Sequence, residues 1–322
     1  MARPTALALL LALSGAAVAC GGEDVTYRRR EGEVLTCLRT LELESRNPAG
    51  NEGRVRQEVT TRETAVEVIP RERMTTEVLI ERVVIEVFRG GKDPVVRMDS
   101  KEEPGPSPAA PGAGKAAERF EAFVRPLRHL AGSRVEVSQR PSGIIVKIDG
   151  VDALRDRLLA AIPEGDPTRP VAEKMSWGFW LTNLCRPAVT VPERPASTGV
   201  DSEFLDMRTL PETVGVQGFA YFRGKYRLAE VKDGVARLTM EGEASLDPAP
   251  RQQPWRPEWV PGRNRLRLQR GVCRGWARIR VEDGRLLEDE HVTDLDLRFV
   301  RPDGSGEVPI PQKVTQRTKL VE

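Results

Sequence analysis

Hydrophobic and polar positions alternate through much of the first hundred residues, as in strands of a sheet that is solvated on one face. The alternating runs are rich in Val, Ile and Thr, and turn formers such as the stretch NPAGNEG separate them. Residues 83–88 are apolar on both faces except at Glu86, which is typical of a central strand. The pattern therefore predicts four strands, over residues 34–44, 55–69, 75–88 and 95–98.

The same alternation returns in the last third of the chain. Asp233-Gly234 and Asp283-Gly284 are dipeptides typical of two-residue hairpin turns. Leu295, Leu297 and Phe299 lie on one side of a further alternating run. We expect strands over residues 218–231, 235–243, 263–270 and 274–281, around residues 295–299, and over residues 314–321.

The middle of the chain changes to the spacing of amphipathic helices. Pro126 must end or kink the first of these helices, whose apolar positions are 120, 123, 124 and 127. Residues 134–149 predict a hairpin, and Asp152 is placed to cap a second short helix that turns Leu154, Leu158 and Ile162 inward. A third helix is expected over residues 170–184.

These elements predict an α+β fold dominated by antiparallel strands. We expect a large curved sheet or partial barrel, with about three helices packed on its concave side. The expected regions are a signal peptide (1–19), an N-terminal β region (20–100), a Pro/Gly/Ala linker (101–114), a helix–hairpin–helix middle (115–185) and a C-terminal β region (200–322). The two β regions are expected to share one sheet.

The N-terminus has the features of a cleavable secretory signal. Arg3 supplies a positive start, residues 5–13 are rich in Leu and Ala, and small residues follow at Ala17 and Ala19. The apolar run is shorter than the ~20 residues that span a bilayer. We therefore expect export to the periplasm, the cell envelope or the extracellular space.

Cys20 directly follows the predicted cleavage site. The stretch from Ala17 to Cys20 resembles the lipobox of bacterial lipoproteins, in which the cysteine becomes a lipidated N-terminus, although Ala17 stands where that motif usually has Leu. Two interpretations stay open: Cys20 is lipidated, or it lies by chance beside an ordinary cleavage site. Membrane contact is expected only through such an anchor.

Charge and cysteine content narrow the classes of function. Lys and Arg total 50 and Asp and Glu total 48, which argues against a nucleic-acid binder with its basic excess. Cys37, Cys185 and Cys273 permit three alternative single disulfides in an oxidising compartment. Cys37 and Cys273 both alternate with apolar residues, which favours small inward-facing side chains. No C-x-x-C is present, so a redox function is not expected.

The sequence predicts no catalytic residue, no metal site and no cofactor. The two histidines, His129 and His291, have no second histidine at ligand spacing, and no serine-hydrolase or phosphate-loop motif occurs. Asp294 and Asp296 alternate opposite apolar residues, as on an exposed strand face. A distant carboxylate pair of the glycosidase type stays open as an alternative.

Four tryptophans are the candidate ligand-binding residues. Trp255 and Trp259 lie in the proline-rich stretch 248–262, where indole rings can form a stacking surface or can close over the end of a sheet. Trp177 and Trp180 lie on the third predicted helix, where a core position is the competing interpretation.

The chain resembles a group of exported bacterial proteins and lipoproteins of unknown function. The resemblance rests on the opening stretch 27–33, the hairpin within residues 132–150, the turns at Asp233 and Asp283, and the closing stretch 316–320. A more distant likeness is to the half-barrel carriers of bacterial lipids and lipoproteins, which implies a curved sheet but no particular activity.

From the sequence we expect an exported, non-enzymatic envelope protein that binds an apolar ligand such as a lipid, or an envelope protein, in the concavity of its sheet. The first alternative is a purely structural or interaction module of the cell surface. The second is a carbohydrate-active enzyme.

Overall fold

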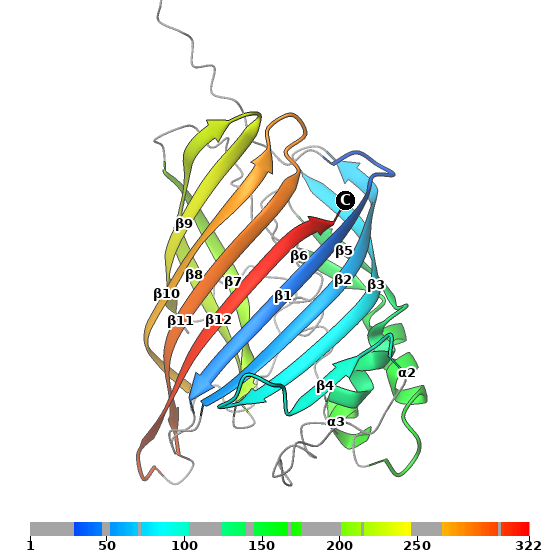
Figure 1. The fold of residues 1–322 in the computed structure, drawn as a ribbon, viewed down its shortest axis with the longest axis vertical. Coiled ribbons are helices and arrows are strands. Elements are labelled where there is room, and N and C mark those ends of the chain that lie inside the picture. Colours follow the sequence, from blue (N-terminus) through cyan, green and yellow to red (C-terminus); the bar gives the residue numbers. More distant parts are fainter. Residues whose placement is uncertain are drawn as a thin grey trace, which may run out of the picture.

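Twelve antiparallel strands form one sheet in the computed structural model (Figure 1). The structure describes residues 29–46, 52–69, 72–102, 124–139, 145–166, 169–174, 201–213, 216–245, 266–301 and 304–321. The strand order is β6-β5-β3-β2-β1-β12-β11-β10-β9-β8-β7, and β4 also pairs with β3. The N-terminal strands are β1 (Val34–Arg46), β2 (Glu52–Ile69), β3 (Arg73–Arg89), β4 (Val96–Asp99), β5 (Arg134–Gln139) and β6 (Ile145–Asp149). The C-terminal strands are β7 (Asp201–Thr213), β8 (Val216–Lys232), β9 (Val235–Ser245), β10 (Leu266–Arg280), β11 (Leu286–Val300) and β12 (Glu307–Val321).

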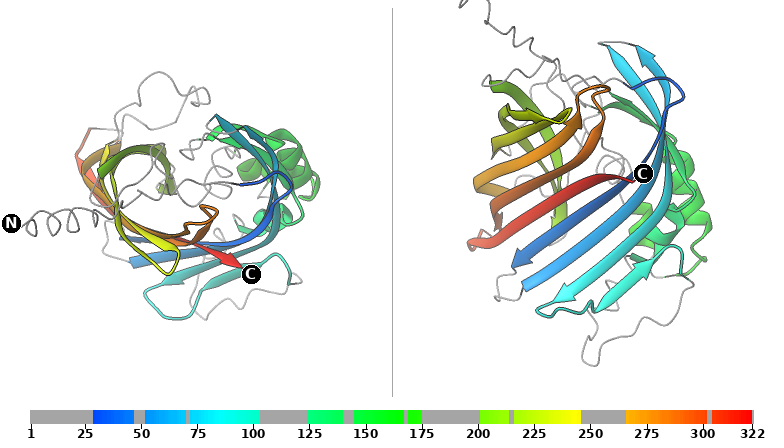
Figure 2. Two further views of the ribbon diagram at one scale, coloured as in Figure 1. Left: turned by 90° about the horizontal axis from the view of Figure 1, so that it is seen from above. Right: turned by 45° about the horizontal axis from the view of Figure 1, so that its top comes forward.

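The first and last strands of the chain meet in the middle of the sheet. β1 pairs with β12 over ten residue pairs, from Thr36 opposite Val321 to Ser45 opposite Gln312. Seen from its end, the sheet curls into an open C, with β7 and β6 at the two ends of the strand order (Figure 2). Long strands with the ordinary right-handed twist curve a sheet of this size in this way.

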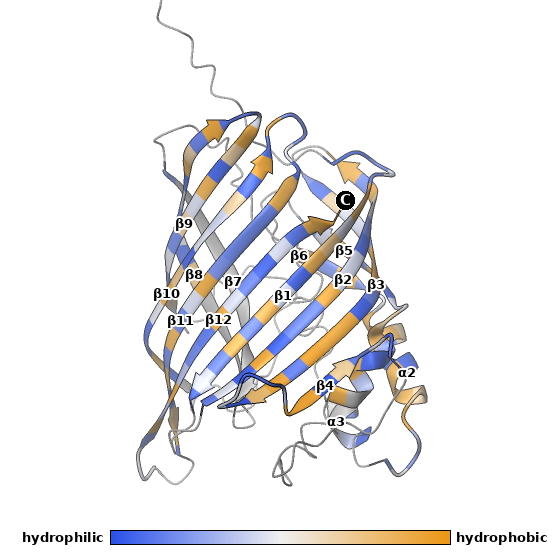
Figure 3. Ribbon diagram, viewed as in Figure 1, coloured by the Kyte–Doolittle hydropathy of each residue, from blue (hydrophilic) through white to orange (hydrophobic). Residues whose placement is uncertain are grey.

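The two faces of the sheet differ in chemistry because side chains alternate along every strand. The face that carries Cys37, Arg39 and His291 is called the buried face, since most of its side chains are covered. The face that carries Arg54 and Lys313 is called the charged face, because Arg, Lys, Glu and Asp recur on it. The mixture of blue and orange along each strand in Figure 3 reflects this alternation.

Apolar side chains gather in two parts of the buried face. One cluster joins strands β2 to β6 to the helical segments, and includes Ile80, Val83, Leu127 and Leu158, all with almost no exposed surface. On the other side of the C, two clusters on β8 to β12 centre on Phe222, Tyr226, Met240, Cys273, Leu297, Leu238 and Ile279. Burying each such side chain stabilises the fold by ~1.5–3 kcal/mol.

The expected fold class is wrong about the number of helices and about where they lie on the sheet. One α-helix longer than two turns is present in the described residues, α2 (Val151–Ala160), beside the six-residue α3 (Arg169–Lys174) and the 3₁₀ helix η1 (Arg125–Leu130). They lie at the β4–β6 edge of the sheet instead of filling its concave side (Figures 1 and 2). Helical spacing reports that a segment has an apolar face, but not which part of a sheet this face covers.

The predicted cap of the second helix is also wrong, although its inward residues are confirmed. Leu154, Leu158 and Ile162 are buried. Asp152 lies in the first turn, and the N-cap is Gly150, with a left-handed φ of 87°. A side chain at Gly150 would lie 3.2 Å from the carbonyl oxygen of Arg134, so the tight passage from β6 into α2 requires glycine.

Most predicted strands are confirmed, with ends that differ by a few residues, except that β11 and β12 begin nine and seven residues earlier than predicted. Two predictions in the last third need correction. The segments 263–270 and 274–281 belong to one strand, β10, which continues through Gly271 and Gly275. β7 was not predicted.

β10 has glycine at positions 271 and 275 because atoms of the neighbouring strands β9 and β11 approach it closely there. An added Cβ at Gly271 would lie 2.5 Å from the Cβ of Ala244, and one at Gly275 would lie 2.5 Å from the carbonyl oxygen of Glu290 and 2.9 Å from Nδ1 of His291.

Candidate functional site

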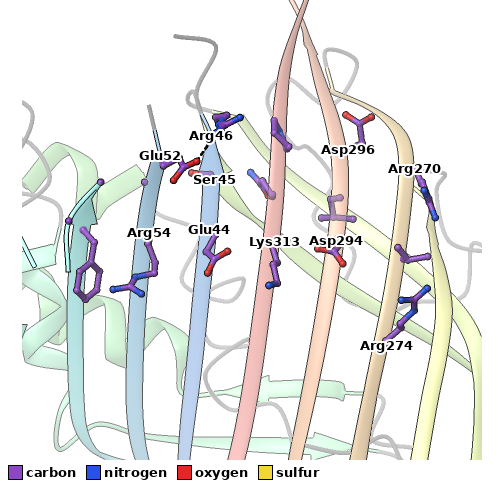
Figure 4. A pocket seen from close by; sticks show the side chains of 18 residues that line it. Glu44, Ser45, Arg46, Glu52, Arg54, Arg270, Arg274, Asp294, Asp296 and Lys313 are labelled. Atoms are coloured by element: carbon purple, nitrogen blue, oxygen red, sulfur yellow. Dashed lines mark hydrogen bonds and ion pairs between the residues drawn. The ribbon is translucent and has the colours of Figure 1, made fainter. Parts of the chain in front are cut away.

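A groove of about 860 Å³ crosses the charged face of the sheet (Figure 4). Six adjacent strands line it, from β3 through β2, β1, β12 and β11 to β10. It lies where β1 ends and β2 begins. The labelled charged side chains lie on the side of the sheet that faces the viewer, with the helices on the far side. Ten of the lining residues are Glu44, Ser45, Arg46, Glu52, Arg54, Arg270, Arg274, Asp294, Asp296 and Lys313.

Charges of opposite sign face one another across neighbouring strands in this groove. Arg54 on β2 lies opposite Glu44 on β1, Glu44 lies opposite Lys313 on β12, and Lys313 lies opposite Asp294 on β11. Directly opposed charges of opposite sign favour this strand register. The row is therefore a ladder with near-zero net charge, and not a patch of one sign.

Only some of the charges in the groove are neutralised by contact. Arg46 pairs with Glu52 at 2.7 Å, and Arg54 pairs with Glu42 at 3.5 Å while its guanidinium lies 3.9 Å above the ring centre of Phe88. Asp296 is 3.8 Å from Arg298 on the same strand. The groove thus has polar walls and one aromatic ring covered by a cation.

Five charged groups of the groove have no side-chain ion pair or hydrogen bond within the described part of the chain. They are Glu44, Asp294, Lys313, Arg270 and Arg274. A charged side chain that lines a groove and makes no contact in it is available to a ligand. Donors and acceptors are both present, so a polar or zwitterionic ligand fits this site.

A second cluster of charges lies on the buried face, where Glu63 holds two arginines. Arg39 on β1 donates hydrogen bonds to the Glu63 carboxylate and to Thr61. Arg29, which precedes β1, lies 3.5 Å from the same carboxylate and donates a 3.1 Å hydrogen bond to the backbone carbonyl of Glu63. Arg29 also reaches Thr76 on β3 at 3.5 Å.

Burial raises the pKa of Glu63, but the charges of Arg39 and Arg29 outweigh it and hold the pKa below the ordinary value of 4.5. The neighbouring thiol behaves in the opposite way. Burial, followed by the charge of Glu63, raises the pKa of Cys37 to about 12. Cys37 and Cys273 are both buried, which confirms their interpretation as inward-facing residues.

His291 and Asp289 form a buried pair on β11. Nε2 of His291 lies 3.1 Å from Oδ2 of Asp289, and Oδ1 of Asp289 accepts a 2.8 Å hydrogen bond from the backbone N–H of Thr318. Gly275 leaves room for the imidazole on the neighbouring strand. His291 is therefore a hydrogen-bonded residue of the buried face.

His129, at the end of η1, is partly buried. Burial, then the charges of Arg128 and Arg157, lowers its pKa. The described residues contain no group of three or more His, Cys, Asp or Glu side chains that could hold a metal ion. Among the helices that the structure describes, none is long and apolar enough to cross a membrane.

The residues predicted as binding sites from the sequence all lie outside the described ranges. This holds for Trp177, Trp180, Trp255 and Trp259, and for the candidate lipidation site Cys20. The groove was missed because its residues come from six strands spread over most of the chain. Asp294 and Asp296 were recognised as an exposed strand face, which is correct, but their opposite partners on β12 and β10 have no sequence signal.

No protein-family model matches the chain, and no curated protein matches it. Among solved structures, one of lipovitellin, described by its lipid–protein interactions, has a TM-score of 0.44 and 12% identity over 91% of this chain. This chain spans 25% of that one.

Two bacterial structures match more weakly. The β domain of the Bordetella autotransporter Brka has a TM-score of 0.25 and 7% identity, over 89% of this chain and 98% of that one. Pseudomonas aeruginosa OccK7 has a TM-score of 0.19 and 6% identity, over 90% of this chain and 100% of that one. All three scores are below 0.5, so no conclusion about function is drawn from them.

Proposed function

We propose that this chain is an exported, non-enzymatic binding protein that holds a polar ligand or a segment of a partner protein in the groove of its charged face. The observation that carries this proposal is the groove itself: it crosses six strands, and Lys313, Arg270 and Arg274 face it without a side-chain partner in the described residues. Ligand sites orient their ligand through a small number of polar groups, and these three cations can supply them.

The positions of the side chains with displaced pKa values favour binding over catalysis. Displaced pKa values mark catalytic sites when the group is also within reach of a ligand. Glu63 and Cys37, two buried groups with displaced pKa values, lie on the opposite face from the groove, and arginines hold the carboxylate of Glu63. Asp99 on β4, a third such group, is not among the residues that line the groove, and Arg82 and Arg97 hold its carboxylate. The proposal therefore assigns the groove recognition and no reaction.

An apolar ligand is a second candidate, and the buried face favours it. Phe222 and Tyr226 on β8 and Met240 on β9 belong to one buried apolar cluster with Cys273, Leu295, Leu297 and Ile310. These side chains are already covered. An apolar ligand could contact these side chains only by displacing the atoms that cover them. A polar ligand can enter the groove without displacing protein atoms.

Native mass spectrometry of the protein purified from an envelope fraction tests both candidates. We expect a mass above that of the denatured chain. Lys313→Glu should abolish the excess mass, because it reverses the central charge of the groove. Lys319→Glu, on the same strand and the same face but outside the groove, should retain it.

Three outcomes decide between the candidates. Equal native and denatured masses for the wild type would contradict a stably bound ligand at either site. Excess mass that survives Lys313→Glu, and that is extracted into organic solvent as a lipid, would move the binding site to the buried face. Excess mass that is lost only in Lys313→Glu supports the groove.

A further inference from the structure

The outward side of β10 carries arginines with apolar or aromatic residues between them. Arg270, Val272, Arg274 and Trp276 occupy alternate positions of this strand, so their side chains all lie on the charged face. The first three line the groove, and Trp276 lies two residues beyond Arg274, ~7 Å farther along the strand. These four residues, called the β10 row, therefore continue from the groove along β10.

Trp276 is a large aromatic side chain among polar neighbours. It is partly exposed, and the adjacent positions on this face are all polar: Arg274 and Arg278 along β10, Thr239 on β9 and Glu290 on β11. No cation of the described residues lies over its ring, and its indole N–H makes no hydrogen bond to another described residue. A partly exposed aromatic ring on a polar face can stack against the apolar face of a ligand.

The two arginines of the β10 row are exposed and unpaired. Arg274 lies directly opposite Glu241 on β9, yet it makes no ion pair in the described part of the chain. Arg270 lies opposite Asp296 on β11 and is likewise unpaired there. Figure 4 shows both arginines on the same strand, and four residues of strand correspond to ~13 Å. A guanidinium binds carboxylate, sulfate or phosphate through two parallel hydrogen bonds, so the row offers two separate anion sites.

Acidic side chains flank the β10 row on both neighbouring strands. Glu241 and Glu243 lie on β9, and Glu290 and Asp294 lie on β11, all opposite members of the row. Arg317 holds the carboxylate of Glu290 at 2.5 Å, whereas the other three have no ion pair with a described residue. Carboxylates accept hydrogen bonds from hydroxyl groups and repel a chain of phosphates. The surroundings therefore fit a ligand with hydroxyl donors, a few anionic groups and an apolar ring face.

We propose that the β10 row binds an acidic saccharide. A sugar ring stacks on Trp276, its anionic groups bind Arg274 and Arg270, and its hydroxyls donate to the flanking carboxylates. The inference rests on the proposed function and names the class of ligand that the groove takes. A nucleic acid is disfavoured because its sites have an excess of cations, and the carboxylates of β9 and β11 remove such an excess here.

Isothermal titration calorimetry of the purified full chain tests the class of ligand. The probes are tetrasaccharides of galacturonic acid, of mannuronic acid and of heparin. Maltotetraose is the neutral control, and single-stranded oligodeoxythymidine represents nucleic acid. We expect at least one acidic tetrasaccharide to bind at least about tenfold more tightly than maltotetraose, because hydrogen bonds to charged groups are the stronger ones. The proposal is overturned if none does, or if the oligonucleotide binds more tightly than every acidic tetrasaccharide.

Substitutions assign the binding to the β10 row. Trp276→Ala should weaken binding of the preferred tetrasaccharide at least about tenfold, whereas Trp276→Phe, which keeps an aromatic ring, should weaken it at most about threefold. Arg274→Ala should also weaken it at least about tenfold. Arg56→Ala is the matched control, because Arg56 lies on the charged face of β2 outside the groove, and should change binding less than about twofold.

Thermal unfolding shows whether each variant is folded, and Arg274→Ala carries the test if Trp276→Ala does not fold. Wild-type affinity in a folded Trp276→Ala or Arg274→Ala variant would overturn the site.

Native mass spectrometry separates this inference from a failure of the proposed function. Excess mass that is lost in Lys313→Glu but kept in both Trp276→Ala and Arg274→Ala would overturn the β10 row and leave binding in the groove intact. Equal native and denatured masses of the wild type, together with no binding of any acidic tetrasaccharide, would contradict both. Excess mass that is lost in all three variants supports both.

Discussion

Arg29, which precedes β1, donates a 3.1 Å hydrogen bond from Nη2 to the backbone carbonyl of Glu63 on β2, thirty-four residues later. Arg39 on β1 binds the carboxylate of the same Glu63. One buried carboxylate thus holds two guanidinium groups, and connects the residues before β1 to the sheet.

Glu63→Gln should strongly destabilise the fold. The amide cannot neutralise Arg29 and Arg39, and removing one partner of a buried charge pair costs ~3–5 kcal/mol. The free energy of unfolding in urea measures this loss. Glu58→Gln is the matched control, since Glu58 lies on the charged face of the same strand and its surface pair with Arg56 contributes at most ~1 kcal/mol. Equal losses in the two variants would contradict a special role for Glu63.

The stabilising effect of Glu63 should disappear in acid. Its pKa is lower in the folded than in the unfolded chain, so its contribution is fully present above the unfolded value of about 4.5 and is lost as the pH falls through the folded value. The difference in unfolding free energy between wild type and Glu63→Gln should therefore be constant from pH 7 to pH 5 and shrink below about pH 4.5. A difference that grows in acid would show that the folded pKa is raised instead.

Cys37 should resist thiol reagents in the folded protein. With a pKa of about 12, almost none of it is thiolate at pH 8, and the side chain is buried. In a chain that retains Cys37 as its single cysteine, maleimide labelling should be at least about a thousandfold slower than in the same chain in urea. Gly91→Cys, added to a chain without other cysteines, supplies the exposed control, and comparable rates for both would contradict this environment.

Gly275→Ala should destabilise the sheet while Gly53→Ala should not. The added methyl at Gly275 meets the backbone carbonyl of Glu290 at 2.5 Å, and overpacking of this kind costs ~1–3 kcal/mol. At Gly53 the nearest atom is the hydroxyl of Ser45 at 3.8 Å, an ordinary contact, so we expect a change within ~0.5 kcal/mol. Denaturant midpoints measure both, and similar values for the two variants would show that β10 can shift away from β11.

Patterns of a few neighbouring residues predicted most of the strands and the hairpin turns. Alternation located β1, β2 and β3, and the Asp-Gly dipeptides located hairpin turns, at one of which Asp233 adopts a positive φ of 52°. The same alternation assigned Cys37 and Cys273 to the inward side of their strands. These properties follow from the period of a strand and the geometry of a turn, which a few neighbouring residues specify.

The tertiary structure alone decided the rest, because the decisive contacts join residues far apart in the chain. Nothing near Glu44 indicates that Lys313 lies opposite it, and nothing near Glu33 indicates that Arg285 binds it. The position of the helices was predicted wrongly for the same reason, since an apolar helix face does not specify which strands it covers. The sequence by itself determined where most strands form, although not β7, and which side chains within a strand share a face. Only the pairing of the first strand with the last brought the charges of the groove together.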